Sequence, residues 1–93
     1  MASFSVNRAK SATLGVATVD TITFPATYAY ETVTVINKDA TSPIYFTVDG
    51  TTPTVAGDDC FCAPVNQSCI ASFQGGTVKL IAAAAAAYTV QSE

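Results

Sequence analysis

The chain has 93 residues, of which 49% are hydrophobic and only 12% charged, and its formal net charge is -3 at pH 7. This length predicts one domain, because a second unit would be too small to bury a core of its own. The four cations are too few for a nucleic-acid site, and the chain lacks an apolar stretch of the roughly 20 residues that span a membrane. We therefore expect a single soluble domain with no nucleic-acid or membrane partner.

The composition also argues against an enzyme. The chain contains no histidine, which removes the commonest general base and the commonest metal ligand together. Most carboxylates lie where turns are expected, and the adjacent pair Asp58 and Asp59 would point to opposite faces of a strand. We therefore expect no catalytic residues.

The N-terminal residues 1–11 are expected to form a flexible arm, followed by a single β-sandwich domain at 12–93. In the arm, Phe4, Val6, Arg8 and Lys10 alternate with small or polar residues, in a segment too short and polar to build a core. One interpretation is that the arm adds as an extended strand to the edge of a neighbouring protein. The other is a frayed terminus, which most domains have.

Short runs rich in Thr, Val, Ile, Tyr and Phe, separated by Gly, Pro, Asp and Asn, predict an all-β chain. In the clearest run, at 31–37, Val33 and Val35 alternate with threonines and are expected to point inward. The expected strands span residues 13–24, in two segments bent near Asp20, and then 31–37, 43–48, 60–65, 68–73, 77–81 and 88–91. About seven strands at this spacing predict a small immunoglobulin-like sandwich of two sheets.

Two connections are expected to be hairpins. Residues 60–65 and 68–73 are expected to pair across a tight turn, and the alanine run 82–87 to turn the chain back before the last strand. One helical turn is the alternative for the alanines, although six residues are too few for an isolated helix. The predicted core combines the apolar residues at inward strand positions: Phe24, Val33, Val35, Ile44, Phe46, Val48, Ile70, Val78, Leu80 and Val90.

Three cysteines and one acidic loop carry the residue types that bind metals. Cys60, Cys62 and Cys69 lack a fourth ligand and the usual Cys-X-X-Cys spacing of a zinc site. We interpret them as buried free thiols, with a cross-strand Cys62–Cys69 disulfide as the alternative. The loop 49–59 has carboxylates at both ends but not the ligand spacing of an EF-hand, which favours a polar turn over a calcium site. No metal or cofactor is therefore expected.

Three tyrosines lie on or near neighbouring expected strands: Tyr28, Tyr30 and Tyr45. The apolar ring and polar tip of tyrosine suit contact with a protein or a sugar, and they suit packing at the rim of the core equally. The candidate partner-binding residues are these tyrosines and the four arm residues named above.

Several segments resemble small β-sandwich structural proteins of tailed bacteriophages, of the capsid decoration or accessory type. They are VTVIN at 33–37, IYFTVDGTTPT at 44–54 and GDD at 57–59, followed by VKLI at 78–81 and YTV at 88–90. The segment 44–54 is also similar to part of the C-terminal immunoglobulin-like domains of chitobiases, which are non-catalytic sandwich modules. Both resemblances imply a β-sandwich.

The phage resemblance implies a non-enzymatic virion protein made in the cytoplasm of a bacterial host. Its leading form is a capsid decoration protein bound to the major capsid protein or other virion proteins, with a homo-oligomer on the virion as a further expectation. A neck or tail accessory protein is one alternative. A carbohydrate-binding sandwich module that uses the tyrosines is another, although the chain has no tryptophan for sugar stacking.

Overall fold

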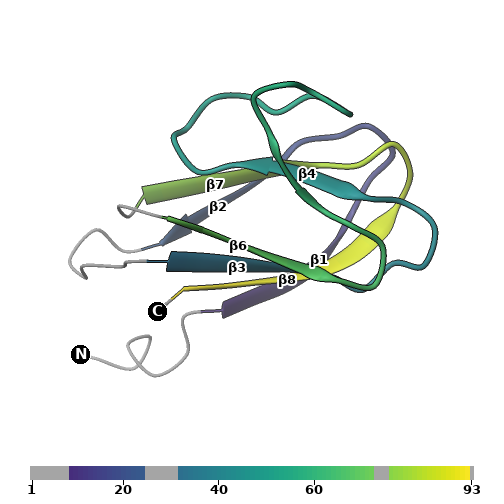
Figure 1. The fold of residues 1–93 in the computed structure, drawn as a ribbon, viewed down its shortest axis with the longest axis horizontal. Helices are drawn as coiled ribbons and strands as arrows, with labels where there is room; N and C mark the ends of the chain where they lie inside the picture. The colour runs from purple at the N-terminus through teal and green to yellow at the C-terminus, as the bar shows by residue number, and fades with distance from the viewer. Residues whose placement is uncertain (1–8, 25–31, 73–75, 93) are drawn as a thin grey trace.

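The structure is a computed structural model that describes residues 9–24, 32–72 and 76–92. These residues form eight strands and no helix (Figure 1). The strands are β1 (Ala9–Leu14), β2 (Asp20–Phe24), β3 (Thr32–Asn37), β4 (Ile44–Thr47), β5 (Phe61–Ala63), β6 (Ser68–Ser72), β7 (Gly76–Ile81) and β8 (Ala86–Ser92).

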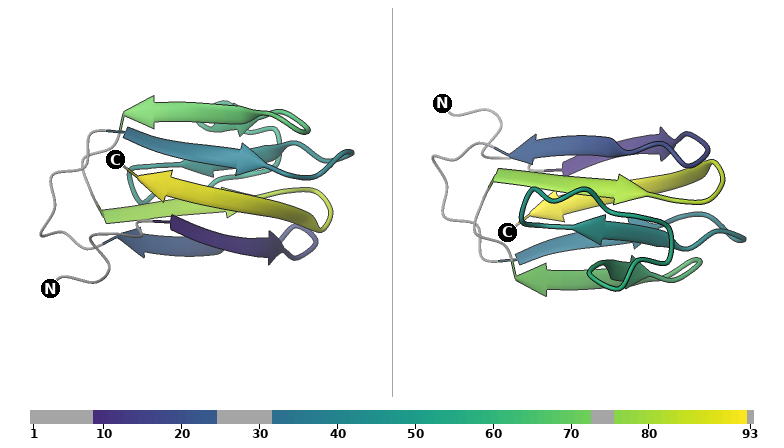
Figure 2. Two further views of the ribbon diagram at one scale, coloured as in Figure 1. Left: turned by 90° about the horizontal axis from the view of Figure 1, so that it is seen from below. Right: turned by 90° about the horizontal axis from the view of Figure 1, so that it is seen from above.

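The strands form two antiparallel four-stranded sheets packed face to face (Figures 1 and 2). Sheet A has the order β1-β8-β3-β6, and sheet B has the order β2-β7-β4-β5. The pairing is nested, because β1 pairs with β8, β2 with β7, β3 with β6 and β4 with β5. A long hairpin rolled up in this way is the strand order of an eight-stranded jelly roll.

The two-sheet sandwich expected from the sequence is thereby confirmed, with eight strands in place of about seven. The strand order differs from that of immunoglobulin domains, where the first two strands are neighbours in one sheet. Here β1 and β2 lie in different sheets. Alternation of apolar and polar residues predicts that a strand has a buried face, but it does not say which strand lies beside it.

Both expected hairpins are wrong for this reason. The segments predicted to pair at 60–65 and 68–73 contain β5 and β6, which belong to different sheets, and so do β7 and β8 on either side of the alanine run. The chain crosses from one sheet to the other in both places. Ala82 and Ala86 are buried at the second crossing, where small side chains let the backbone pass close to the core.

The predicted boundary between arm and sandwich, after residue 11, is wrong. β1 begins at Ala9 and pairs with β8 from Ala9 opposite Gln91 to Leu14 opposite Ala86. Residues 9–11, assigned to the arm from the sequence, therefore belong to the sandwich, and residues 1–8 lie outside the described part of the chain.

The predicted core is confirmed at most positions. Of the ten predicted residues, eight are buried and Val48 packs against the core from a partly buried position. Ile70 is the exception, because its side chain is 66% exposed. In β6 the inward positions are those of Cys69 and Ala71, so the predicted phase of this strand was wrong by one residue.

Asn37, at the end of β3, has a buried side-chain amide that joins the two sheets. Its Nδ2 donates to the carbonyl oxygens of Ser42 at 2.9 Å and Ala63 at 3.0 Å, and its Oδ1 accepts from the N–H of Asp39 at 2.8 Å. Ala63 belongs to β5 of sheet B. Every polar atom of the buried amide therefore has a partner, as burial requires.

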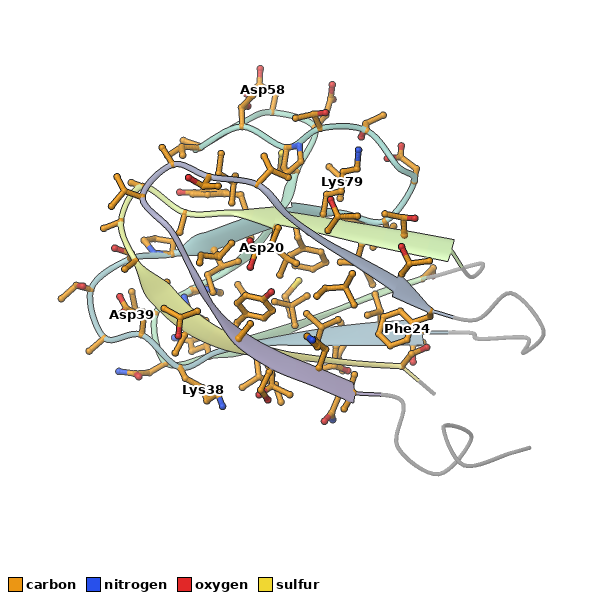
Figure 3. All side chains as sticks on the ribbon, turned by 180° about the vertical axis from the view of Figure 1, so that it is seen from behind. Asp20, Phe24, Lys38, Asp39, Asp58 and Lys79 are labelled. Atoms are coloured by element: carbon orange, nitrogen blue, oxygen red, sulfur yellow. The ribbon has the colours of Figure 1, made fainter. Side chains whose placement is uncertain are left out.

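Tyr88 makes a second bridge between the sheets. Its side chain is fully buried in β8, and its hydroxyl donates to Oδ2 of Asp20 in β2 at 2.8 Å. Figure 3 shows Asp20 directed between the sheets, whereas Lys38, Asp39, Asp58 and Lys79 lie at the periphery. Burial, together with the bond to Asp20, raises the pKa of Tyr88 well above its usual value of 10. The protonated phenol is thus the form that fits the core.

Phe46→Ala is expected to lower the free energy of unfolding by roughly 3–5 kcal/mol, because Phe46 is fully buried and its removal leaves a cavity. Phe61 is the matched control, since its ring stacks on Phe46 at 5.4 Å between centroids but is 43% exposed. Phe61→Ala should cost only about 1–2 kcal/mol. Urea unfolding measures both, and equal losses would contradict the assigned positions of the two rings.

Tyr88→Phe is expected to lower stability at neutral pH by about 1–2 kcal/mol, because Asp20 loses its donor. Because the pKa of Tyr88 is raised in the folded state, the protonated phenol contributes fully to the free energy of unfolding below about pH 10. This contribution is progressively lost as the pH rises further. The variant should therefore lose less stability than the parent between pH 7 and about pH 11. Urea unfolding across this range, with Tyr45→Phe as control, should show the two stability curves converging for Tyr88→Phe alone; parallel curves would contradict the account.

Candidate interaction surface

The structure describes two of the seven candidate partner-binding residues. Lys10 lies in β1 and is exposed, and Tyr45 lies half-buried on the outer face of β4. Tyr45 is opposite Cys62 and Ile81 in the neighbouring strands. The other five, Phe4, Val6, Arg8, Tyr28 and Tyr30, lie outside the described residues. The structure thus places Lys10 and Tyr45 on different sheets and does not bring them together.

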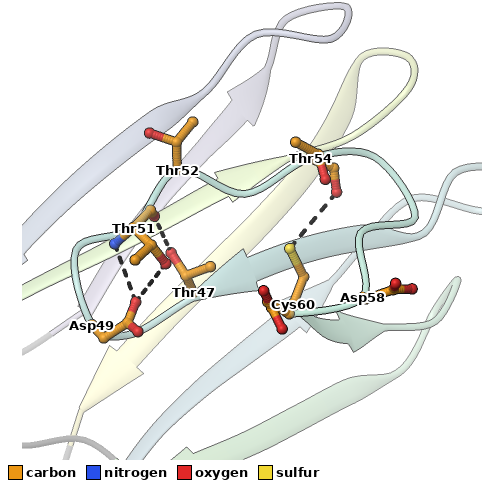
Figure 4. A pocket seen from close by; sticks show the side chains of 8 residues that line it. Thr47, Asp49, Thr51, Thr52, Thr54, Asp58 and Cys60 are labelled. Atoms are coloured by element: carbon orange, nitrogen blue, oxygen red, sulfur yellow. Dashed lines mark hydrogen bonds between the residues drawn. The ribbon is translucent and has the colours of Figure 1, made fainter.

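A pocket of about 490 Å³ opens where the loop after β4 folds back over sheet B (Figure 4). The loop is held by local hydrogen bonds. Thr47 Oγ1 donates to the carbonyl oxygen of Thr51 at 2.6 Å, and Asp49 Oδ1 accepts from the N–H and hydroxyl of Thr51 at 3.1 and 2.6 Å. Gly50, between them, has φ +87°, a conformation that favours glycine. The pocket is therefore lined mainly by residues that organise the loop itself.

The acidic side chains of this pocket do not converge on one point. Asp49 lies at one end of the pocket and Asp58 at the other (Figure 4). The hydroxyl and N–H of Thr51 lower the pKa of Asp49, which shows that its charge is already stabilised by the loop. Among the described residues no group of three or more histidine, cysteine or acidic side chains is placed to hold a metal ion. The geometry is that of a polar, self-bonded loop.

The three cysteines are free thiols, and no disulfide joins Cys62 to Cys69. They are less buried than expected: Cys62 is exposed, and Cys60 and Cys69 are partly exposed. Partial burial, and to a smaller extent the proximity of Cys62, raise the pKa of Cys69. Cys69 is therefore held in its neutral, weakly nucleophilic form.

None of the outward strand positions on sheet A carries a charged side chain, and the exposed Lys38 follows directly after β3. Each of the four strands of this sheet contributes three outward positions, all exposed or half-buried. They are Ala9, Ser11 and Thr13; Ala87, Thr89 and Gln91; Thr32, Thr34 and Ile36; and Ser68, Ile70 and Ser72. Ser11 and Thr89 are joined across the strands by a hydroxyl–hydroxyl hydrogen bond of 2.7 Å.

The outer face of sheet B differs in charge. Lys79 stands on it between Thr21 and Thr47, and the loop over this sheet carries Asp49 and Asp58. The sequence reasoning missed the contrast between the two faces. Serine and threonine at alternate positions look like ordinary solvent-facing residues, and only the strand order shows that four such rows lie side by side.

Calcium and chelators are expected to leave the protein unchanged, because the pocket carboxylates are separated and Asp49 is occupied by Thr51. A ligand that binds only the folded state raises the melting temperature by mass action. With millimolar calcium or with EDTA, the melting temperature should therefore shift by less than about 1 °C. A calcium-dependent rise, or a stoichiometric metal in the purified protein, would contradict this.

The described residues contain no helix of the length and hydropathy needed to cross a membrane. Comparison with known proteins finds no matching family model, no matching curated protein and no matching solved structure.

Proposed function

We propose that this chain is a non-enzymatic structural protein of a tailed-phage particle, a capsid decoration protein that binds the shell through the outer face of sheet A. The resemblance of segments such as 33–37 and 44–54 to structural proteins of tailed phages supports the virion role, and the uncharged outward strand positions of sheet A support this face as the bound one. About a quarter of the residues in a typical soluble domain are charged, and they are normally spread over the surface. Strand positions without charge lose little by being covered.

The chemistry of the face suits a flat protein partner. Its hydroxyl and amide groups, such as those of Thr34 and Gln91, form hydrogen bonds without the desolvation cost of ions. Ile36 and Ile70 add apolar area beside them. A face of this size gives a modest contact on its own, and repeated docking on a lattice of identical subunits compensates through the number of copies.

The architecture is compatible with this role. Eight-stranded jelly rolls build many viral capsid domains, and they also occur in lectins and cupins. The fold alone therefore does not select a function.

Thr34→Lys is expected to remove the protein from particles while leaving it folded. Thr34 lies in the middle of the uncharged face, between Gln91 and Ile70, so a lysine there introduces a charge that the covered face cannot solvate. Thr21→Lys is the matched control, because Thr21 is exposed on the outer face of sheet B. Mass spectrometry of purified particles complemented with each variant measures copy number relative to the major shell protein.

The proposal predicts a parental copy number that scales with the shell protein, near-complete loss of Thr34→Lys, and normal incorporation of Thr21→Lys. A copy number matching one neck or tail ring would move the protein to that position. Absence of the parental chain from particles would overturn the structural role, and normal incorporation of Thr34→Lys would show that sheet A is not the bound face.

A further inference from the structure

The edges of the two sheets differ in how well they are protected. In the described part of the chain, the edge strands are β1 and β6 in sheet A and β2 and β5 in sheet B. Unpaired backbone groups on an edge are a template for pairing with another chain, and charges or short strands prevent it. β1 carries Lys10, β2 carries Asp20, and β5 has only three residues. β6 has five residues, with neither charge nor proline.

The register shows which backbone groups of β6 point away from sheet A. The N–H of Asn37 donates to the carbonyl oxygen of Gln67 at 2.9 Å, at the end of the antiparallel β3–β6 ladder. Because hydrogen-bonded pairs alternate along such a ladder, residues 67, 69 and 71 direct their backbone groups to β3. The backbone groups of Ser68, Ile70 and Ser72 therefore point away from the sheet.

The other side of β3 confirms this alternation. The N–H of Lys38 donates to the carbonyl oxygen of Ala87 at 2.9 Å, so the even-numbered residues of β3 bond to β8. The backbone groups of the odd-numbered β3 residues therefore face β6, in agreement with the bond from Asn37 to Gln67.

The sequence of β6, SCIAS, is nearly symmetric about its central residue. A two-fold axis at Ile70 places Ser68 opposite Ser72 of a second copy, and Ile70 opposite its own counterpart. All three residues have outward-pointing backbone groups, so each opposed pair exchanges its N–H and C=O bonds. No like charges meet, because the strand has none. A second copy of this strand can therefore pair with all of the outward backbone groups of β6.

We propose that two copies of this chain associate by antiparallel pairing of their β6 strands about a two-fold axis at Ile70. The two sheets A then form one continuous eight-stranded sheet, with Ile70 of each copy side by side on its outer face. The inference is independent of the proposed function, since it concerns the isolated protein and does not require a virion.

Sedimentation equilibrium of the full chain, with a reductant to keep Cys62 from linking copies, tests the pairing. Ile70→Lys places two lysines directly opposite each other and should weaken the dimer at least about tenfold. Val16→Lys is the matched control, because Val16 is 67% exposed in the turn between β1 and β2, against 66% for Ile70. This variant should dimerise like the parent.

Ser68→Pro separates edge pairing from packing of the two faces. Proline is tolerated at the first residue of a strand, and this change removes an outward N–H while leaving Ile70 in place. Edge pairing predicts a dimer about fivefold to a hundredfold weaker, because one intermolecular bond is lost from each copy.

Three results would overturn the proposal. A parental chain that stays monomeric to about 1 mM has no such edge pairing. Loss of the dimer in Ile70→Lys with full retention in Ser68→Pro would show that side chains alone make the contact. Equal weakening by Val16→Lys and Ile70→Lys would show a general effect of added charge. Circular dichroism confirms that each variant is folded before it is scored.

Discussion

The buried amide of Asn37 is the contact on which the connections of this sandwich depend. It reaches from the end of β3 in sheet A to Ala63 of β5 in sheet B, and it also holds the turn toward β4 through Ser42 and Asp39. A buried polar group without a partner costs about 1–3 kcal/mol, so these segments have little freedom to move apart. Backbone bonds from residues 37 and 38 to residues 67 and 87 bring two further connections to the same end. These hydrogen bonds therefore hold several of the connections between strands together at one end of the sandwich.

The outer faces of the two sheets differ in chemistry. The outer face of sheet B has Lys79 and an acidic loop above it, whereas that of sheet A has hydroxyls, amides and a few apolar groups. The nested strand order creates this contrast by placing β1, β8, β3 and β6 side by side although they are distant in sequence. It also leaves β6 at an edge of sheet A, where the backbone groups of Ser68, Ile70 and Ser72 point away from the sheet. The two proposed contacts therefore use one surface of the molecule, one through its face and the other through its edge.

The sequence predicted the class of fold and most of the core, because alternation with a period of two residues is a local signal. Val33 and Val35 show it plainly, and both are fully buried. It did not predict which strands pair, since the crossing at Ala82 and a hairpin leave the same local pattern. The prediction misplaces Ile70 because hydrophobicity alone does not indicate burial, and in β6 the smaller Cys69 and Ala71 face the core. The sheet A face was missed for a related reason: it exists only once distant strands are adjacent.

We propose that the outer face of sheet A is the surface by which this chain is bound. Electron cryomicroscopy of the particle that contains the chain tests this most directly, because the orientation of the sandwich on its partner can be read from the map. The account predicts that sheet A lies against the shell, with Thr34 and Gln91 covered and the loop containing Asp58 facing solvent. A map in which sheet B and its acidic loop contact the shell, with sheet A open to solvent, would contradict it.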